Sequence, residues 1–268
     1  MRALVTGGAG FIGSNLVDAL LDRHDEVSVI DDLSTGKRAN LDCAISRGAD
    51  FHEVDLRDAA RVRSVLAGAR PDIVFHLAAQ ADVRKSIEDP AWDASINVLG
   101  TINVLEASRL AGVRRVVNTS TGGAIYGDTD LMPTPESVEP KPMSAYGQSK
   151  YCAEAYCGWY ERLHGLSSVV LRYGNVYGPR QDPQGEAGVI AIFCGKVLAG
   201  ERPTIFGDGR QTRDYVFVGD IVAANMAAAA HPEAHGSYNI GTGVEASVLE
   251  VVAALREAAA AQSEATAN

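Results

Sequence analysis

The stretch TGGAGFIG, residues 6–13, decides the fold of this 268-residue chain. It follows the apolar run RALVT at residues 2–6 and leads into a segment whose apolar residues Ile12, Leu16 and Leu20 recur at helical spacing. Glycines between a strand and a helix allow a sharp turn and a close approach by a diphosphate, which the first N–H groups of the helix attract. A lone glycine pattern is weak evidence, but this context predicts a dinucleotide-binding loop.

Beyond the loop, short apolar runs alternate with helical segments. The runs are 27–31 (VSVID), 50–55 (DFHEVD), 73–78 (IVFHLA), 114–120 (RRVVNTS) and 168–174 (SVVLRYG). They are continuous rather than alternating, as in strands that are buried on both faces of a parallel sheet. One helix is expected to begin at Asp89–Pro90, a capping residue followed by proline. The pattern predicts an α/β fold with a Rossmann-type doubly wound parallel sheet.

The character of the sequence changes after about residue 174, where glycine and proline become frequent and the elements become shorter. We expect residues 1–172 to form an NAD-binding Rossmann domain, to which residues 210–234 return. Residues 173–209 and 235–268 are expected to form a smaller C-terminal substrate-binding lobe.

Composition argues against several classes of protein. The formal net charge of −10 disfavours a nucleic-acid partner, and no apolar run reaches the length of about 18 residues that a membrane span needs. The chain enters a strand at once without a secretory leader, so a cytoplasmic location is expected. The cysteines lack a CxxC pair, which favours reduced thiols and no metal site; they are Cys43, Cys152, Cys157 and Cys194.

Aspartates end the second and third predicted strands. Asp31 lies about twenty residues beyond the glycine loop, where a carboxylate accepts the ribose hydroxyls of a dinucleotide and repels a 2′-phosphate. This favours NAD over NADP. Asp32 is either a second contact or a cap, and Asp55 either faces the adenine or is a plain loop residue.

Tyr146 and Lys150 form a YxxxK pattern, which puts both side chains on one face of a helix. An ammonium beside a phenol favours the phenolate and lowers the pKa of the phenol, so the pair could take a proton from a sugar hydroxyl. The pattern is common, and its weight comes from its position after the fifth strand. That strand ends in Ser120 and Thr121, which either bridge substrate and tyrosine or cap the turn.

Several motifs in this order resemble the extended short-chain dehydrogenase/reductases. Within them, the chain is similar to the NAD-dependent epimerase/dehydratase group, of the UDP-glucose 4-epimerase kind. The motifs are TGGAGFIG, the acidic Asp31, HLAAQ (76–80), NVLGT (97–101), STGGAIYG (120–127), YGQSK (146–150) and RYGNVYGPRQ (172–181). Together they cover nearly the whole chain, and they are more specific for the superfamily than for the substrate.

The resemblance implies roles for individual residues. Tyr146 would be the base, Lys150 its partner and a ligand of the nicotinamide ribose, and Thr121 the catalytic hydroxyl, with Ser120 as a close rival. The NAD contacts would be Gly7, Gly10, Phe11, Ile12, Gly13, Asp31, Asp32, Asp55, Leu56, Leu77, Ala78, Ala79, Asn97, Tyr146, Lys150 and Tyr173. The substrate contacts would be Ser120, Thr121, Tyr146, Asn175, Val189, Phe206 and Arg213, with Arg213 on a phosphate.

The implied activity is epimerisation of a nucleotide sugar at C4 of a UDP-hexose, through a 4-keto intermediate. Similar 4,6-dehydratases carry Asp-Glu after the strand-five threonine, where this chain has Gly122 and Gly123, so a dehydratase is the weaker alternative. Nucleotide-sugar reductases and decarboxylases, and a catalytically silent dinucleotide-binding regulatory protein, stay open.

The resemblance also implies a homodimer and a shortened lobe. Helices near residues 90–110 and 146–163 would pack against their copies, with Leu105, Leu110, Tyr156 and Trp159 as candidate contacts. Relatives continue past residue 268 through an Arg-Pro-Gly-Asp motif that clamps the diphosphate. This chain ends in AAAAQSEATAN, so we expect its lobe to be shortened at the C-terminus.

Overall fold

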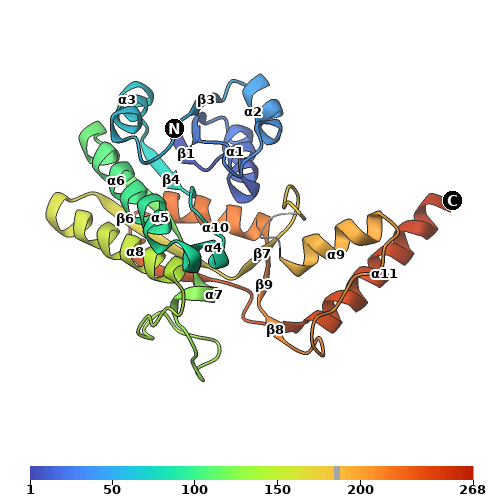
Figure 1. The fold of residues 1–268 in the computed structure, drawn as a ribbon. Coiled ribbons are helices and arrows are strands. Elements are labelled where there is room, and N and C mark those ends of the chain that lie inside the picture. The colour runs from blue at the N-terminus through green and yellow to red at the C-terminus, as the bar shows by residue number, and fades with distance from the viewer. Residues whose placement is uncertain (184–187, 268) are drawn as a thin grey trace.

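The centre of the fold is a seven-stranded, wholly parallel sheet in the order β10-β6-β5-β4-β1-β2-β3 (Figure 1). The computed structural model describes residues 1–183 and 188–267, and the side chains through residue 259. The strands are β1 (Arg2–Thr6), β2 (Glu26–Asp31), β3 (Asp50–Glu53), β4 (Ile73–His76), β5 (Arg115–Thr121), β6 (Ser167–Tyr173) and β10 (Gly236–Ile240). The predicted Rossmann-type sheet is confirmed.

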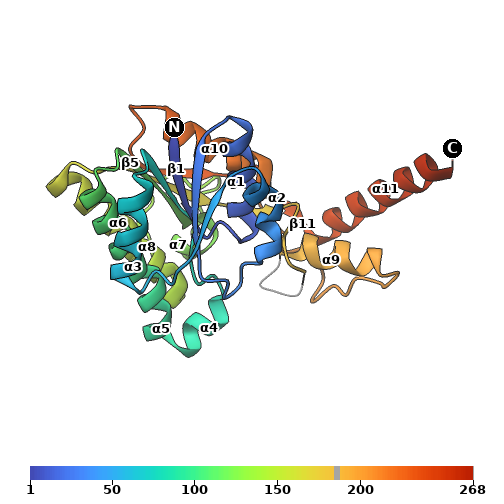
Figure 2. The same cartoon turned by 90° about the horizontal axis from the view of Figure 1, so that it is seen from above.

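Helices cover both faces of the sheet, giving three layers (Figure 2). Helices α1 (Phe11–Asp22) and α10 (Val218–Ala230) pack together on one face; α3 (Ala59–Ala69), α6 (Gly100–Ala111) and α8 (Ala145–His164) cover the other. Successive residues of each strand point to opposite faces of the sheet, where each face has its own hydrophobic core. Val5 packs in the core below α1, whereas its neighbour Leu4 packs in the core below α3 and α6. This double burial explains the continuous apolar runs of the sequence.

The last strand of the sheet, β10, lies in a segment that the sequence assigns to the smaller lobe. The sequence places residues 235–268 in the lobe, whereas β10 pairs in parallel with β6, from Gly236 opposite Val169 to Ile240 opposite Tyr173. The preceding helix α10 already packs on the sheet, and a crossover from it delivers the next strand to the open edge. The run GSYNI is half-exposed and weakly apolar, so its pattern does not reveal a core strand.

Short elements shape the edge of the sheet where the parallel strands end. They are η1 (Arg38–Leu41), α2 (Asp42–Ser46), α4 (Val83–Glu88), α5 (Pro90–Ala94), the π-helical turn η2 (Ser95–Leu99) and α7 (Gly122–Ile125). Helix α5 begins as predicted: the Asp89 side chain accepts a hydrogen bond from the Trp92 N–H, and Pro90 occupies the first turn.

The smaller lobe lies beside the carboxyl edge of the sheet. It contains β7 (Asn175–Tyr177) paired with β9 (Tyr215–Phe217), β8 (Thr212–Arg213) paired with β11 (Ala246–Ser247), α9 (Val189–Leu198) and α11 (Val248–Ala267). Phe193 of α9 and Val248 and Val251 of α11 form its core, and the two helices project away from the main sheet (Figure 1). Within the described residues, no helix has the length and apolarity to cross a membrane.

Candidate active site

The glycine loop is packed too tightly for larger side chains. Gly7 has a φ of +71°, and a Cβ on it would lie 2.6 Å from the Ala78 nitrogen; a Cβ on Gly13 would lie 2.1 Å from the Gly7 oxygen. Helix α1 begins at Phe11 with Gly10 as its cap and without a side-chain capping bond. The first N–H groups of this helix therefore face the loop without intrahelical partners, as an anion site requires.

Asp31 lies at the end of β2 beside this loop and is 8% exposed. Its carboxylate accepts N–H groups from Ala9 and Leu33, each at 2.9 Å. Burial raises the pKa of Asp31, an effect that the two N–H donors oppose and the charge of Asp32 reinforces. Asp32 itself is exposed and accepts from the N–H and hydroxyl of Ser34, so it caps the following turn.

The glycine loop and Asp31 fit the two ends of an adenosine diphosphate moiety. The loop has room for a phosphate only because its glycines lack side chains, and the buried carboxylate repels a third phosphate at the adenosine ribose. These residues therefore fit NAD, and they disfavour NADP.

The remaining expected cofactor residues divide into half-buried and buried groups. Leu77, Ala78 and Ala79 follow β4 and are half-buried, so they line the edge beside the glycine loop. Asp55 forms a bidentate ion pair with Arg57 at 2.6 Å, which lowers its pKa. Leu56 is buried in the core.

Asn97 is buried and acts within the protein. Its Nδ2 donates to the Gln80 carbonyl at 2.9 Å and to Asp93 Oδ1 at 3.1 Å, and its Oδ1 accepts the Gln80 N–H at 2.9 Å. All three bonds tie the segment after β4 to α5 and η2. Asn97 therefore shapes the wall of the cofactor site rather than offering a free amide to it.

Tyr146 and Lys150 lie in the first two turns of α8. The helix is capped by Ser144, whose hydroxyl accepts the Gly147 N–H at 3.1 Å, and the Tyr146 N–H donates to Ser86 of α4 at 3.1 Å. Gly147 is required by a close approach: a Cβ there would lie 2.3 Å from the Ala124 oxygen. This contact brings the start of α8 against α7 and the end of β5.

The strand-five hydroxyls have separate roles. The Thr121 hydroxyl lies close enough to Tyr146 to lower the pKa of the phenol. Ser120 points to the opposite side of the strand, is 2% exposed and finds no hydrogen-bond partner among the described residues. The structure thus pairs Tyr146 with Thr121, not with its rival Ser120.

The electrostatics of the pair differ from the sequence-based expectation. Burial raises the pKa of Tyr146 to about 12, although the Thr121 hydrogen bond lowers it and Asp93 raises it. Burial also lowers the pKa of Lys150 to about 8, against the opposing charges of Glu154 and Asp93. Desolvation is therefore the largest influence on the pKa of both groups.

Tyr173 lies in the hydrophobic core. Its ring is 5% exposed, and its hydroxyl is bonded to Thr119 at 3.1 Å and to Asn225 of α10 at 2.6 Å. Burial raises its pKa to about 12. The hydroxyl is therefore already satisfied inside the protein, which the strand pattern could not reveal.

The expected substrate residues are only partly brought together. A cavity of about 340 Å³ opens beside the ends of β6 and β7 and includes Asn175 and Ile190, the neighbour of Val189. Phe206 is 83% exposed on a loop, and the exposed Arg213 donates to the Thr212 carbonyl. Neither lines this cavity.

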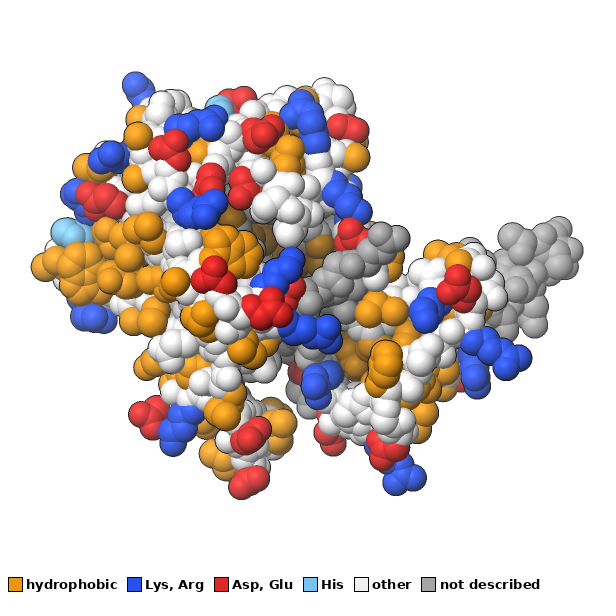
Figure 3. Space-filling model, viewed as in Figure 1, with side chains coloured by type: hydrophobic (Ala, Val, Ile, Leu, Met, Phe, Trp, Pro, Cys, Tyr) orange, Lys and Arg blue, Asp and Glu red, His pale blue; other side chains and the backbone are white. Residues whose placement is uncertain are grey.

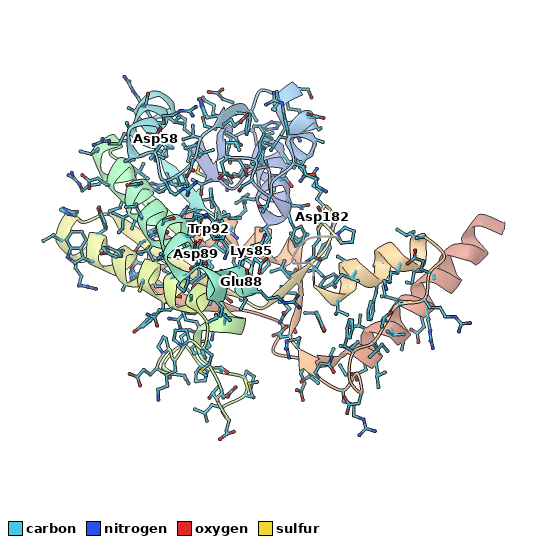
Figure 4. All side chains as sticks on the ribbon, viewed as in Figure 1. Asp58, Lys85, Glu88, Asp89, Trp92 and Asp182 are labelled. Carbon is cyan, nitrogen blue, oxygen red and sulfur yellow. The ribbon has the colours of Figure 1, made fainter. Side chains whose placement is uncertain are left out.

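A loop of the lobe returns over the start of α1. The Pro179 carbonyl accepts from Asn15, Arg180 pairs with Asp18 at 2.6 Å, and Asp182 pairs with Lys37 at 2.6 Å (Figure 4). These bonds fasten the lobe beside the glycine loop. They join residues more than 140 positions apart, so no local pattern could have shown them.

Sequence reasoning also missed a buried polar group beneath the catalytic pair. It contains Asp93, which is fully buried, and His76, whose pKa burial and the nearby Lys150 lower to about 3. A signal was present: Asp93 is the one charged residue of helix α5 (PAWDA), and it stands four residues before Asn97. That spacing places the two side chains on one face.

A dinucleotide loop, an acid at the end of β2 and a Thr–Tyr–Lys group define an NAD-type enzyme of the extended short-chain dehydrogenase/reductase class. The model of the NAD dependent epimerase/dehydratase family matches residues 3–241, and the chain belongs to that family.

Several similar proteins of known structure or curated function are UDP-glucose 4-epimerases. The chain is 47% identical over 265 residues to a UDP-glucose 4-epimerase of Mycolicibacterium smegmatis, covering 98% of this chain and 84% of that protein. A UDP-glucose 4-epimerase of Thermotoga maritima, solved with UDP-glucose, is 48% identical with a TM-score of 0.91, covering 96% and 82%. One of Thermus thermophilus, solved with NAD, is 48% identical with a TM-score of 0.89, covering 97% and 84%.

Proposed function

We propose that the protein epimerises a nucleotide sugar at C4, with a UDP-hexose of the glucose/galactose type as substrate. The observation that carries the proposal is that the Thr121 hydroxyl lies close enough to Tyr146 to lower the pKa of the phenol, with Lys150 one helical turn further along α8. The group stands at the carboxyl edge of a sheet whose first turn is built for a dinucleotide. The relatives solved with UDP-glucose and with NAD support the choice of both ligands.

The protein's own residues bind, orient and move a proton. Bound NAD supplies a hydride acceptor that can also return the hydride, and its oxidised ring carries a positive charge. The phenolate of Tyr146 takes the proton of the 4-hydroxyl and later gives it back, while Thr121 holds that hydroxyl in place. The ammonium of Lys150 favours the phenolate and would hold the cofactor ribose. The Asn175 cavity would receive the nucleotide end of the substrate.

A dehydratase is disfavoured by the residues that follow Thr121. Dehydration needs an acid and a base near C5 and C6, yet these positions are Gly122 and Gly123. A Cβ on Gly122 would lie 3.2 Å from the Tyr173 carbonyl, so position 122 leaves little room for a carboxylate. A silent dinucleotide-binding protein is disfavoured because the chain keeps both Tyr146 and Lys150, on one face of α8.

Turnover with purified protein tests the proposal. We expect UDP-galactose to be converted to UDP-glucose without net production of NADH, because the hydride returns to the sugar. Accumulation of a 4-keto-6-deoxy sugar would instead identify a dehydratase. Binding of NAD without conversion of any UDP-hexose would identify a silent binding protein.

We also propose a homodimer that forms through α6 and α8. Exposed apolar side chains gather over these helices in the left part of the molecule (Figure 3). They are Leu110 (56% exposed), Tyr156 (38%), Trp159 (42%) and Leu163 (60%). Leu105, an expected contact, is wholly buried in the core, because it faces the sheet and not the outer surface of α6. Clustered apolar exposure of this kind is typical of a protein interface.

Leu110→Glu is expected to convert the dimer into a monomer, because it places a charge within the apolar patch. Leu198→Glu, at an 85% exposed leucine of α9 outside the patch, is the matched control and should leave the dimer intact. Sedimentation velocity at micromolar concentration measures both. A wild-type protein that sediments only as a monomer would contradict the proposed dimer.

We also propose that the protein is cytoplasmic. All four cysteines are free in the structure: Cys43, Cys152, Cys157 and Cys194. Free thiols are usual in a reducing compartment.

A further inference from the structure

A layer of buried polar side chains lies between the sheet and helices α5 and α8. His76 and Asn118 are register partners on β4 and β5, and they face the α6–α8 side because their neighbours Phe75 and Val117 belong to the opposite core. Lys150 of α8 and Asp93 of α5 complete the layer from above, since α5 packs on α8. Each of these four side chains is less than 5% exposed.

Asp93 is held in this layer by amide donors. Its Oδ1 accepts Gln80 Nε2 at 2.9 Å and Asn97 Nδ2 at 3.1 Å. Its Oδ2 is buried and has no hydrogen-bond partner among the described residues. Two hydrogen bonds to Oδ1 fix the orientation of the carboxylate. The negative charge on Oδ2 is not offset by any hydrogen bond among the described residues.

The same clamp connects Asp93 to the residues beside Lys150. The Asn97 carbonyl accepts the Thr101 hydroxyl at 2.6 Å, and Thr101 is bonded to His76 Nε2 at 2.9 Å. His76 Nδ1 is in turn bonded to Thr6 at the end of β1, at 2.7 Å. A continuous set of hydrogen bonds thus runs from α5 to the glycine loop, and it passes beside the catalytic lysine.

Among the charged groups of this layer, Asp93 is the carboxylate that can offset the positive charge of Lys150. Glu154, one turn after Lys150, is neutralised by a buried ion pair with Arg172 at 2.6 Å. His76 is neutral, because burial and the charge of Lys150 lower its pKa to about 3. The Lys150 ammonium then has Asp93 as its one uncompensated carboxylate within the described part of the layer. The nearby charged groups of α4, which are Arg84, Lys85 and Glu88, are exposed to solvent.

We propose that Asp93 is a positioning residue for the catalytic pair: its clamped, buried carboxylate is the counter-charge that keeps the Lys150 ammonium protonated in a site closed to water. The role is electrostatic, because Asp93 acts on the cofactor and substrate only through Lys150 and Tyr146. Its charge raises the pKa of both groups. Loss of this charge should therefore lower both pKa values, since an ammonium loses a favourable partner and a phenolate loses an unfavourable one.

Asp93→Asn tests the charge while keeping the shape. The amide oxygen can still accept the two bonds from Gln80 and Asn97, so a purely structural role would be preserved. The control is Asp89→Asn, on the exposed cap of the same helix (Figure 4), where asparagine caps as well as aspartate. Asp93→Ser, smaller and neutral but still able to accept a hydrogen bond, is the second variant if asparagine disturbs the fold.

The first readout needs neither substrate nor turnover. The chain has five lysines, so the ¹³Cε resonance of Lys150 can be identified by comparison with Lys150→Arg and titrated by NMR. We expect its pKa to fall by about 1 in Asp93→Asn and to stay unchanged in Asp89→Asn. An unchanged Lys150 titration in both neutral variants, or loss of the folded state in both, would overturn the inference.

The second readout rests on the proposed function. The active form needs Tyr146 as the phenolate and Lys150 as the ammonium. Because the pKa of Tyr146 lies above that of Lys150, the two limbs of the kcat/KM profile for UDP-galactose report macroscopic pKa values of the pair. We expect both limbs to move to lower pH in Asp93→Asn, by about 1, with little change in either limb for Asp89→Asn. A shifted Lys150 titration in a protein without epimerase activity would contradict the proposed function and leave the role of Asp93 intact.

Discussion

Tyr146→Phe is expected to reduce the rate of UDP-galactose epimerisation by about ten-thousand-fold or more. General acid–base groups contribute about a hundred- to ten-thousand-fold, and epimerisation uses the phenol both to remove and to return the proton. The substitution keeps the ring and removes the interaction of the phenol with the Thr121 hydroxyl. Such a loss is worth about 1 kcal/mol, or roughly 2–4 °C in Tm for a chain of this size. Steady-state kinetics and thermal unfolding measure the two effects separately.

Lys150→Ala is the contrasting variant. It removes the ammonium that favours the phenolate and also the proposed ligand of the cofactor ribose, so both the rate and the affinity for NAD should fall. In Tyr146→Phe the affinity for NAD should survive. A Tyr146→Phe protein that keeps a tenth or more of the wild-type rate would show that the phenol is not the base, even though the fold is correct.

Local patterns were enough to predict the strand, turn and helix of the glycine loop and the position of Asp31 at the end of β2. The glycine loop and Asp31 are read from a few adjacent residues, because a parallel strand, a tight turn and a helix N-terminus are themselves local structures. The structure confirms the sheet that presents them. It also shows why the glycines are needed, since Gly13 approaches the Gly7 carbonyl too closely for any Cβ.

The electrostatics of the catalytic pair could not be predicted in the same way. The YxxxK spacing correctly places both side chains on one face of α8, but the pKa of each depends on burial by segments far away in the chain. The pKa of Tyr146 is raised to about 12 and the pKa of Lys150 is lowered to about 8, chiefly because α4, α5 and the sheet exclude water around the two side chains. Asp93 enters the site for the same reason, and only the packing of α5 against α8 reveals it.

The buried pair Glu154–Arg172 explains how α8 stays fixed to the sheet below the catalytic residues. Arg172 of β6 makes three hydrogen bonds to the Glu154 carboxylate, at 2.6–3.2 Å, and donates to the Tyr126 hydroxyl at 2.6 Å. Both charged side chains are only 6% exposed. The Tyr126 hydroxyl donates in turn to Asn239 Oδ1 of β10 at 2.7 Å. The ion pair and this hydrogen bond together link α8 to β6 and β10.

Arg172→Leu is therefore expected to destabilise the protein by about 3–5 kcal/mol, because it leaves the Glu154 carboxylate buried without its partner. The double variant Glu154→Leu/Arg172→Leu should recover much of that loss, since an apolar pair avoids the unpaired charge. Arg47→Leu is the matched control: it breaks the exposed pair with Asp22, whose side chains are 36% and 71% exposed, and should cost less than about 1 kcal/mol. Urea denaturation measures all three. If the double variant were no more stable than Arg172→Leu alone, the damage would come from lost packing around Tyr126 and not from an uncompensated charge, and the pair would have to be regarded as a spacer between α8 and β6.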